Sequence, residues 1–131
     1  DLLKKLLIPI ATVVTPNLDE AEILTGIQVR SLEEMKEAAQ SLYRSCKGVK
    51  AVLIKGGHLK GDPIDLLFDG RRTHLFPARR WPGSPRHGTG CILSSAIAAN
   101  LALGLSLKKS VEAGRRYLQE VNEPCAKSRR L

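Results

Sequence analysis

A short apolar run bounded by lysines, Lys50–Lys55, most constrains what this chain can fold into. Apolar residues without alternation are typical of a strand that is buried on both faces of a sheet, as in parallel sheets. Two glycines, Gly56 and Gly57, follow the run directly. The pattern therefore predicts a central strand that delivers a loop able to approach a ligand closely.

Helix and strand patterns precede this run. The β-branched stretch 10–14 ends at a Thr-Pro pair and predicts a strand followed by a turn. Asn17, with Glu20 three residues later, forms a capping-box pattern, and Gly26 marks the end of the helix that it begins. Apolar residues at helical spacing then predict an amphipathic helix over 31–46. The alternation indicates an α/β fold.

Different elements are expected after the central run. Residues 64–68 and 73–76 flank Asp69-Gly70, a dipeptide that favours a hairpin between antiparallel strands. The proline- and arginine-rich stretch 77–87 is predicted to be a loop. The helix that follows, ending at Gly104, is apolar or small on nearly every face and is expected to be packed on both sides. An amphipathic helix over 107–121 completes the prediction.

Composition limits the partners. The 131 residues carry 21 basic and 13 acidic side chains, a net charge of +8, which suits an anionic partner. Only 4% of the residues are aromatic, which argues against a base-stacking nucleic-acid surface. The longest weakly charged stretch, 88–107, contains serines and glycines and fits a buried helix, so no membrane span is expected. Three cysteines without a C-x-x-C pair favour a reducing, cytoplasmic setting.

The strongest local signal is the sequence His87-Gly88-Thr89-Gly90-Cys91. Two glycines allow the backbone to pass close to a ligand, and the first amides of the following helix point at it. Such an arrangement binds a phosphate or stabilises charge on a phosphoryl group in transfer. Taken alone, the same residues also fit a glycine-rich helix start with a buried, inert cysteine.

Two further groups are weaker by themselves. Asn17 and Glu20 fit a plain helix cap, or a pair that organises Mg²⁺-bound water and nucleotide phosphates. Lys55 stands at the carboxyl end of a predicted strand, where α/β proteins place ligands, but it also fits a solvated lysine beside an ordinary turn. The three histidines have no metal-binding spacing and fit surface positions.

In combination, four motifs resemble the hydroxymethylpyrimidine/phosphomethylpyrimidine kinases of thiamine biosynthesis, in the ribokinase-like superfamily. The motifs are residues 15–22, 52–58, 65–70 and 87–91, and the resemblance extends to about Val121. It implies a three-layer αβα, Rossmann-like sheet fold. It also implies Mg-ATP-dependent phosphorylation of 4-amino-5-hydroxymethyl-2-methylpyrimidine and of its monophosphate. The expected partners are ATP and a small pyrimidine, without nucleic acid or membrane.

The resemblance also implies roles for individual residues. Cys91 falls where many sugar kinases of the superfamily have an aspartate base, so it is the candidate to take the hydroxyl proton. Lys55 matches a lysine that contacts the transferring phosphate, and Glu20 matches a residue that holds Mg²⁺ through water. The remaining matches bind ATP phosphates, partly as an anion hole: Gly88, Thr89, Gly90, Asn17 and Gly57.

Length departs from the family, whose members are about twice as long. The match is to their second half, so residues 1–131 are expected to form the C-terminal portion of a single kinase domain and to have little activity alone. Pyridoxal kinase and a non-catalytic, nucleotide-binding half-kinase are the alternatives. Self-association, or pairing with the missing N-terminal half, is also open.

Overall fold

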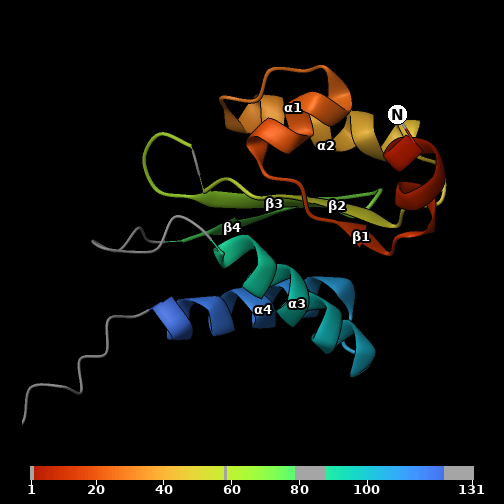
Figure 1. Cartoon of the computed structure of the whole chain (residues 1–131). Helices are drawn as coiled ribbons and strands as arrows, with labels where there is room; N and C mark the ends of the chain where they lie inside the picture. The colour runs from red at the N-terminus through yellow and green to blue at the C-terminus, as the bar shows by residue number, and fades with distance from the viewer. Residues whose placement is uncertain (1, 58, 79–87, 123–131) are drawn as a thin grey trace, which may run out of the picture. The chain divides into compact units, whose positions relative to one another are not determined.

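The computed structural model describes residues 2–57, 59–78 and 88–122, and the chain divides into two compact units, 1–79 and 80–131 (Figure 1). Of the described elements, all the strands lie in the first unit, and the second unit holds two helices. The elements of the first unit are η1 (Leu3–Leu7), η2 (Ile8–Ile10), β1 (Val13–Val14), α1 (Leu18–Thr25), α2 (Leu32–Ser45), β2 (Ala51–Ile54), β3 (Ile64–Phe68) and β4 (Thr73–Pro77). Those of the second unit are α3 (Thr89–Ala102) and α4 (Leu107–Asn122).

The strands form one mixed sheet in the order β1-β2-β3-β4. β1 is parallel to β2, with Val13 opposite Ala51 and Val14 opposite Val52. The crossover between these parallel strands contains α1 and α2, as a βαβ connection requires. β2, β3 and β4 are antiparallel neighbours. The predicted strand–helix alternation is therefore confirmed in this unit.

The core of the first unit lies between the sheet and the two helices α1 and α2, which cover one of its faces (Figure 1). Met35 and Leu42 of α2 are fully buried in the same cluster as Val52, Ile54 and Leu66 of the sheet. Each such side chain contributes about 1.5–3 kcal/mol by leaving water. This core fixes the carboxyl end of β2, from which the predicted ligand loop leaves.

The strand predicted over 10–14 is shorter than expected. Ile10 belongs to η2 and is 79% exposed, and only Val13–Val14 pair with β2. The physical reason is Pro9, which lies in a 3₁₀ turn that begins at Ile8 and in which the Ala11 N–H donates to the Ile8 carbonyl oxygen at 3.1 Å.

The predicted hairpin is present between β3 and β4, where Phe68 pairs with Thr73. Asp69 closes the turn, because its Oδ1 accepts from the backbone N–H groups of Arg71 and Arg72 at 2.9 and 2.7 Å. Gly70 has a φ of 88°, which glycine adopts without the steric penalty of a side chain. The sequence signal and the observed turn agree.

The second unit is a pair of packed helices. Leu93 and Ile97 of α3 are buried, and a Cβ on Gly114 of α4 would lie 3.1 Å from the Ile97 side chain. Within this unit, α3 packs against α4 through Leu93 and Ile97. That α3 is packed on both sides stays a prediction. No helix in the described ranges is both long and apolar enough to cross a membrane.

Candidate functional site

The carboxyl ends of β1 and β2 bring two predicted site residues together. Asn17 and Lys55 form an isolated parallel bridge just beyond the two strands. The Lys55 N–H donates to the Pro16 carbonyl oxygen at 2.9 Å, which extends the parallel pairing into the turn before α1. In open α/β sheets, ligands bind at this edge. The Lys55 side chain is half-buried at this position.

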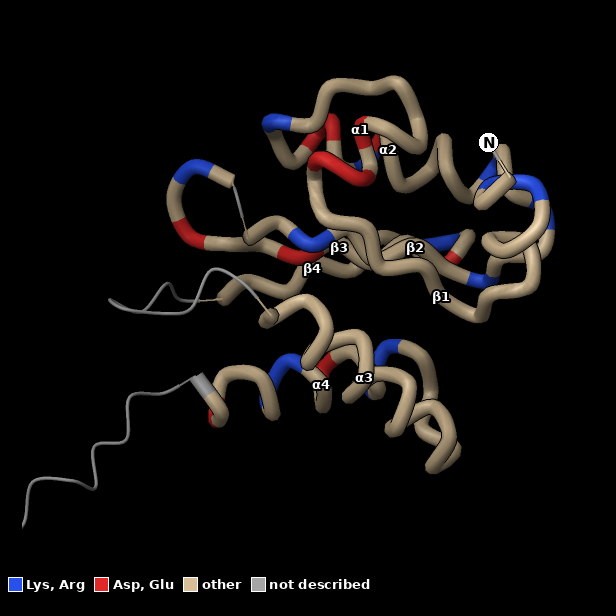
Figure 2. The backbone as a smooth tube through the Cα atoms, in the orientation of Figure 1, with Lys and Arg blue, Asp and Glu red and all other residues tan. Residues whose placement is uncertain are grey.

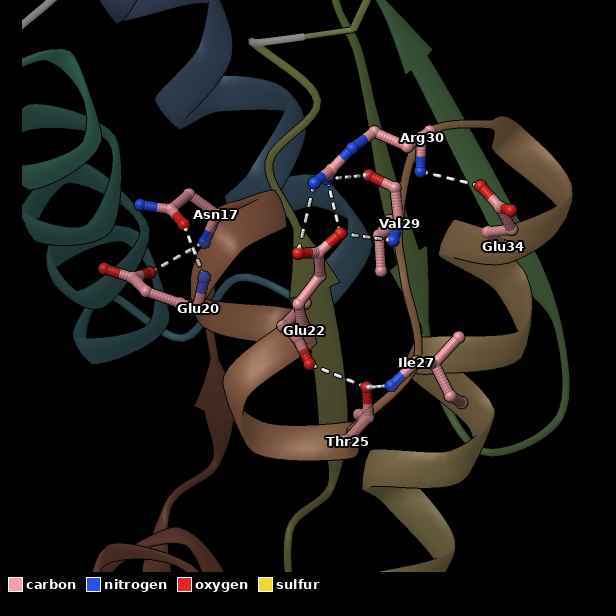
Figure 3. A network of polar contacts seen from close by, with 9 residues as sticks. Asn17, Glu20, Glu22, Thr25, Ile27, Val29, Arg30 and Glu34 are labelled. Carbon is pink, nitrogen blue, oxygen red and sulfur yellow. Dashed lines mark hydrogen bonds and ion pairs between the residues drawn. The ribbon is translucent and has the colours of Figure 1, made fainter.

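The predicted capping box at the start of α1 is present. Asn17 Oδ1 accepts from the Glu20 N–H at 2.8 Å, and Glu20 Oε2 accepts from the Asn17 N–H at 2.7 Å. Figure 3 shows the Asn17 amide nitrogen and the second Glu20 oxygen pointing away from the cap. Each side chain therefore satisfies the helix with one atom and presents another outward.

A magnesium ion held directly by protein would need several oxygen ligands. Within the residues that the structure describes, no three His, Cys, Asp or Glu side chains gather in such a group. Glu20 is exposed and offers one carboxylate. This donor set fits Mg²⁺ that keeps its waters and is bound mainly through substrate phosphates.

The two glycines after β2 have different roles. A Cβ on Gly56 would collide with the carbonyl oxygen of Ile64, so this glycine is required by the close approach of two backbone segments. A Cβ on Gly57 would meet no atom within 4 Å. Gly57 is exposed, and space for a ligand is therefore available beside it and not beside Gly56.

Asp65 is a positioning residue that the sequence reasoning missed. Its carboxylate is buried, at 7% exposure, and Oδ1 accepts from the Gly56 N–H at 2.9 Å. This bond ties β3 to the loop that begins just after Lys55. The available signal was an acidic residue inside the apolar strand 64–68, because such a residue is rarely buried without a partner.

A second missed feature holds the segment that follows α1 (Figure 3). Glu22 accepts from the Val29 N–H at 2.7 Å and pairs with the Arg30 guanidinium. The Arg30 N–H donates to Glu34 at 2.7 Å, and this bond is the main cause of the lowered pKa of Glu34. These contacts connect the end of α1 to the start of α2.

The predicted anion hole lies at the start of α3, in the second unit. Gly88 is the N-cap, with a φ of 87° and no side-chain cap, and the first helical bond runs from the Ile92 N–H to the Gly88 carbonyl oxygen at 3.3 Å. The amides of Thr89, Gly90 and Cys91 therefore have no acceptor within the helix. The alternative of a buried cysteine is wrong, because Cys91 is exposed.

The other helices begin differently. Asn17 caps α1 and Ser31 caps α2, while Ser106 Oγ accepts from the Lys109 N–H at 3.4 Å at the start of α4. Among the four α-helices of the described ranges, α3 alone starts without a side-chain cap that an observed hydrogen bond identifies. That arrangement suits a bound anion.

The predicted site residues divide between the two units. The first unit brings Asn17, Glu20 and Lys55 together and places Gly57 two residues after Lys55. Residues 88–91 form a separate group in the second unit. His58, His87 and most of the arginine-rich loop, including Arg79, Arg80 and Arg86, lie outside the described residues.

Charge is unevenly distributed over the first unit (Figure 2). Acidic residues occupy the first turns of both α1 and α2, where the positive end of the helix dipole stabilises their negative charge. Lys55 contributes a basic side chain beyond the carboxyl end of β2. Lys55 is paired with Asn17 through the backbone, and the exposed Glu20 carboxylate belongs to the same cap, which is a set of groups suited to a metal–phosphate ligand.

Solved structures with the same architecture are small-molecule kinases. Pyridoxal kinase from Staphylococcus aureus in complex with ADP superposes with a TM-score of 0.86 at 36% identity, over 92% of this chain and 45% of that chain. Phosphomethylpyrimidine kinase from Clostridium difficile gives a TM-score of 0.76 at 36% identity, over 91% of this chain and 46% of that chain. The predicted ribokinase-like α/β class is confirmed.

Sequence relatives define the family more narrowly. Hydroxymethylpyrimidine/phosphomethylpyrimidine kinase from Aquifex aeolicus is 44% identical over 121 residues, which are 92% of this chain and 47% of the relative. The enzyme of the same name from Rhizobium meliloti is 49% identical over 114 residues, 86% of this chain and 42% of the relative. The family profile described as phosphomethylpyrimidine kinase matches residues 1–128. The chain belongs to this family, and it spans about half the length of these curated relatives.

Proposed function

We propose that this chain supplies the nucleotide and phosphoryl-transfer side of a kinase for 4-amino-5-hydroxymethyl-2-methylpyrimidine and its monophosphate. The observation that carries the proposal is the meeting of Asn17, Glu20 and Lys55 beyond the carboxyl ends of two parallel strands. The names of the relatives and of the Clostridium difficile structure support the choice of acceptor. Mg-ATP is the proposed phosphoryl donor, and the cytoplasm is the proposed compartment.

The residues have distinct roles in this proposal. Lys55 contacts the transferring phosphoryl group and offsets its charge, while the amides of Gly88, Thr89 and Gly90 receive its oxygens. The acceptor hydroxyl oxygen forms a bond to the γ-phosphorus as the bond to ADP breaks, and the hydroxyl proton passes to the Cys91 sulfur.

Asn17 and Glu20 organise the phosphates around the metal. Glu20 uses one oxygen for the α1 cap and offers the other to metal-bound water, and Asn17 offers its amide to the phosphates or to those waters. A bound Mg²⁺ supplies neutralisation of the phosphate charge. Gly57 leaves space for the nucleotide to approach the loop after Lys55.

Activity is proposed to require the part of the kinase that this chain does not span. That part would complete the acceptor pocket, so the 131-residue chain alone is expected to bind nucleotide and to transfer phosphate slowly or not at all. Pyridoxal is the second candidate acceptor, because pyridoxal kinases are among the matching structures at 36% identity. A binding module without catalysis is the third reading.

The test compares acceptors in a single-chain fusion of residues 1–131 with the part of the Aquifex aeolicus kinase that this chain does not match. Transfer from radiolabelled ATP to the pyrimidine, with slower transfer to pyridoxal, supports the proposal. The Lys55→Met variant should reduce turnover, while Lys60→Met, at an exposed position in the same loop, should not. Transfer to neither acceptor, with ATP binding retained, would instead favour the non-catalytic module.

A further inference from the structure

Asp65 is the one charged side chain that is buried in the described part of the first unit, at 7% exposure. Burial of a carboxylate costs free energy unless hydrogen bonds replace its hydration, and an apolar residue of similar size often stabilises a fold as well or better. The next two residues of β3, Leu66 and Leu67, are buried and apolar. The acid at this position is therefore expected to have a task beyond filling the sheet.

Asp65 lies where the chain leaves the sheet toward the candidate site. β2 and β3 run side by side, and the last pair of their ladder at this end is Ile54 opposite Leu66 (Figure 1). Asp65 and Lys55 each lie one residue beyond that pair. The buried carboxylate is therefore adjacent in the fold to the lysine that is proposed to contact the phosphoryl group.

The Asp65 carboxylate replaces a backbone acceptor at Gly56. The Ile64 carbonyl oxygen approaches Gly56 so closely that a Cβ there would collide with it, yet the Gly56 N–H donates to Asp65 Oδ1 at 2.9 Å. In an uninterrupted antiparallel ladder, such an N–H bonds to a backbone carbonyl of the neighbouring strand. The side chain therefore ends the ladder and sets the direction in which the chain leaves β2.

The second polar group of Gly56 is held as well. Its carbonyl oxygen accepts from the Leu59 N–H at 3.0 Å, and the Leu59 side chain packs against the core of the first unit. Beside this fixed peptide, Gly57 is exposed and has open space where a Cβ would lie. The backbone that leads from Lys55 to Gly57 is thus ordered by contacts within the protein.

We propose that Asp65 is a positioning residue for phosphoryl transfer, which orients the Gly56 peptide so that Lys55 and Gly57 meet the nucleotide phosphates in a fixed arrangement. Asp65 does not contact the nucleotide and acts through Gly56. Binding by a loop that is already ordered avoids the entropic cost of ordering it, and a fixed cation assists transfer more than a mobile one. The identity of the ligand, Mg-ATP, rests on the proposed function.

A purely structural role makes a different prediction. A carboxylate that only satisfies the Gly56 N–H would stabilise the fold and leave the ATP affinity of the folded protein unchanged. A positioning role affects both quantities, because loss of the bond disorders backbone that the phosphates contact. The discriminating measurement is therefore the dissociation constant of Mg-ATP on folded protein, beside the free energy of unfolding.

Calorimetric titration of the 131-residue chain with Mg-ATP compares two substitutions. Asp65→Ala removes the acceptor and should weaken binding about tenfold, while Asp65→Asn keeps an acceptor oxygen and should weaken it about threefold. Asp69→Asn is the matched control just beyond the opposite end of β3, where Asp69 Oδ1 accepts from backbone N–H groups of the hairpin. It should lower the stability without changing the ATP affinity. Affinities within about twofold of wild type for both Asp65 variants would overturn the proposal.

A second pair of variants covers the case in which Asp65→Ala does not fold. Leu59→Ala releases the other anchor of Gly56 and should weaken Mg-ATP binding about threefold or more. Leu32 at the start of α2 is also partly buried against the same core, so Leu32→Ala should lower the stability and leave the ATP affinity unchanged. Equal ATP affinities of these two variants would contradict the proposal.

Kinetics in the fusion described above separate this inference from the proposed function. Asp65→Ala should raise the KM for ATP and leave the KM for the pyrimidine within about twofold. An active fusion in which the KM for ATP does not change would refute the positioning role alone. A fusion that phosphorylates neither acceptor, with ATP affinities in the predicted order, would refute the proposed function alone. A wild-type chain that binds no Mg-ATP would refute both.

Discussion

Replacing Asn17 by serine separates its two proposed roles, because serine is an equally good N-cap but lacks the amide. Asn17 Oδ1 accepts from the Glu20 N–H at 2.8 Å, and Glu20 Oε2 accepts from the Asn17 N–H at 2.7 Å. Loss of a cap costs about 0.5–2 kcal/mol, so Asn17→Ala should destabilise the chain by about 1 kcal/mol. Asn17→Ser keeps the acceptor and should change the free energy of unfolding by less than about 0.5 kcal/mol.

The ligand role predicts an equal loss of ATP affinity in Asn17→Ser and Asn17→Ala. If the amide donates to a nucleotide phosphate, its loss removes a hydrogen bond to a charged group, worth about 1.5 kcal/mol or more. Both variants should then bind ATP about tenfold more weakly, although one of them keeps its stability. Urea unfolding and calorimetric titration with Mg-ATP measure the two quantities on the same protein samples.

The matched control is Ser31→Ala, which removes the cap of α2. Ser31 Oγ accepts from the Glu34 N–H at 3.2 Å and is not part of the candidate site. It should lose about 0.5–1 kcal/mol of stability without any change in ATP affinity. If Asn17→Ser binds ATP within twofold of the wild type, then Asn17 acts as a cap and the assignment of a ligand role is refuted.

Three other changes test separate features. Gly56→Ala should destabilise the chain by about 1–3 kcal/mol through its backbone clash. Gly57→Ala should leave the unfolding midpoint unchanged and weaken ATP binding. An unchanged ATP affinity of Gly57→Ala would show that no ligand approaches Gly57. The backbone N–H of Arg72 is the main cause that holds the pKa of Asp69 at about 2, below its usual 3.8. A depressed carboxyl pKa stabilises the fold above about pH 4, and this stabilisation is lost as the pH falls toward 2. Wild type should therefore be more stable than Asp69→Asn by about 1 kcal/mol after solvent screening at neutral pH. Urea titrations should show this difference shrinking between about pH 4 and pH 2. Cys91→Ala in the active fusion should lower kcat far more than ATP affinity, and equal losses would mean that the cysteine only supports the helix start.

The local signals in the sequence predicted most of the first unit. Capping residues defined the starts of α1 and α2, and Asp69-Gly70 defined the hairpin, because these depend on neighbours within a few residues. The strand predicted over 10–14 was wrong at Ile10, because Ile10 belongs to a 3₁₀ turn with Pro9 that outweighs its β propensity. Propensity averages over a window, but a single proline acts on one backbone position.

Non-local features of the site were harder to predict. The sequence placed Asn17 and Lys55 at separate strand ends, and their pairing depends on the register of β1 against β2. It also treated Gly56 and Gly57 alike, although the approach of Ile64 makes only the first one sterically obligatory.

The shortness of β1 has a dynamic consequence. Asn17 is joined to Lys55 through a parallel ladder that contains only two strand residues on each side, and closing it requires the ordering of the whole segment between Val14 and Ala51. The β2–β3–β4 meander depends on contacts closer in sequence, so β1 should be the first strand to detach in local unfolding. Each such opening would separate the amide from the lysine while the rest of the sheet persists. A nucleotide that bridges the two residues would therefore stabilise the pairing of β1 with β2, and its binding would reduce local unfolding in β1 before any other part of the unit.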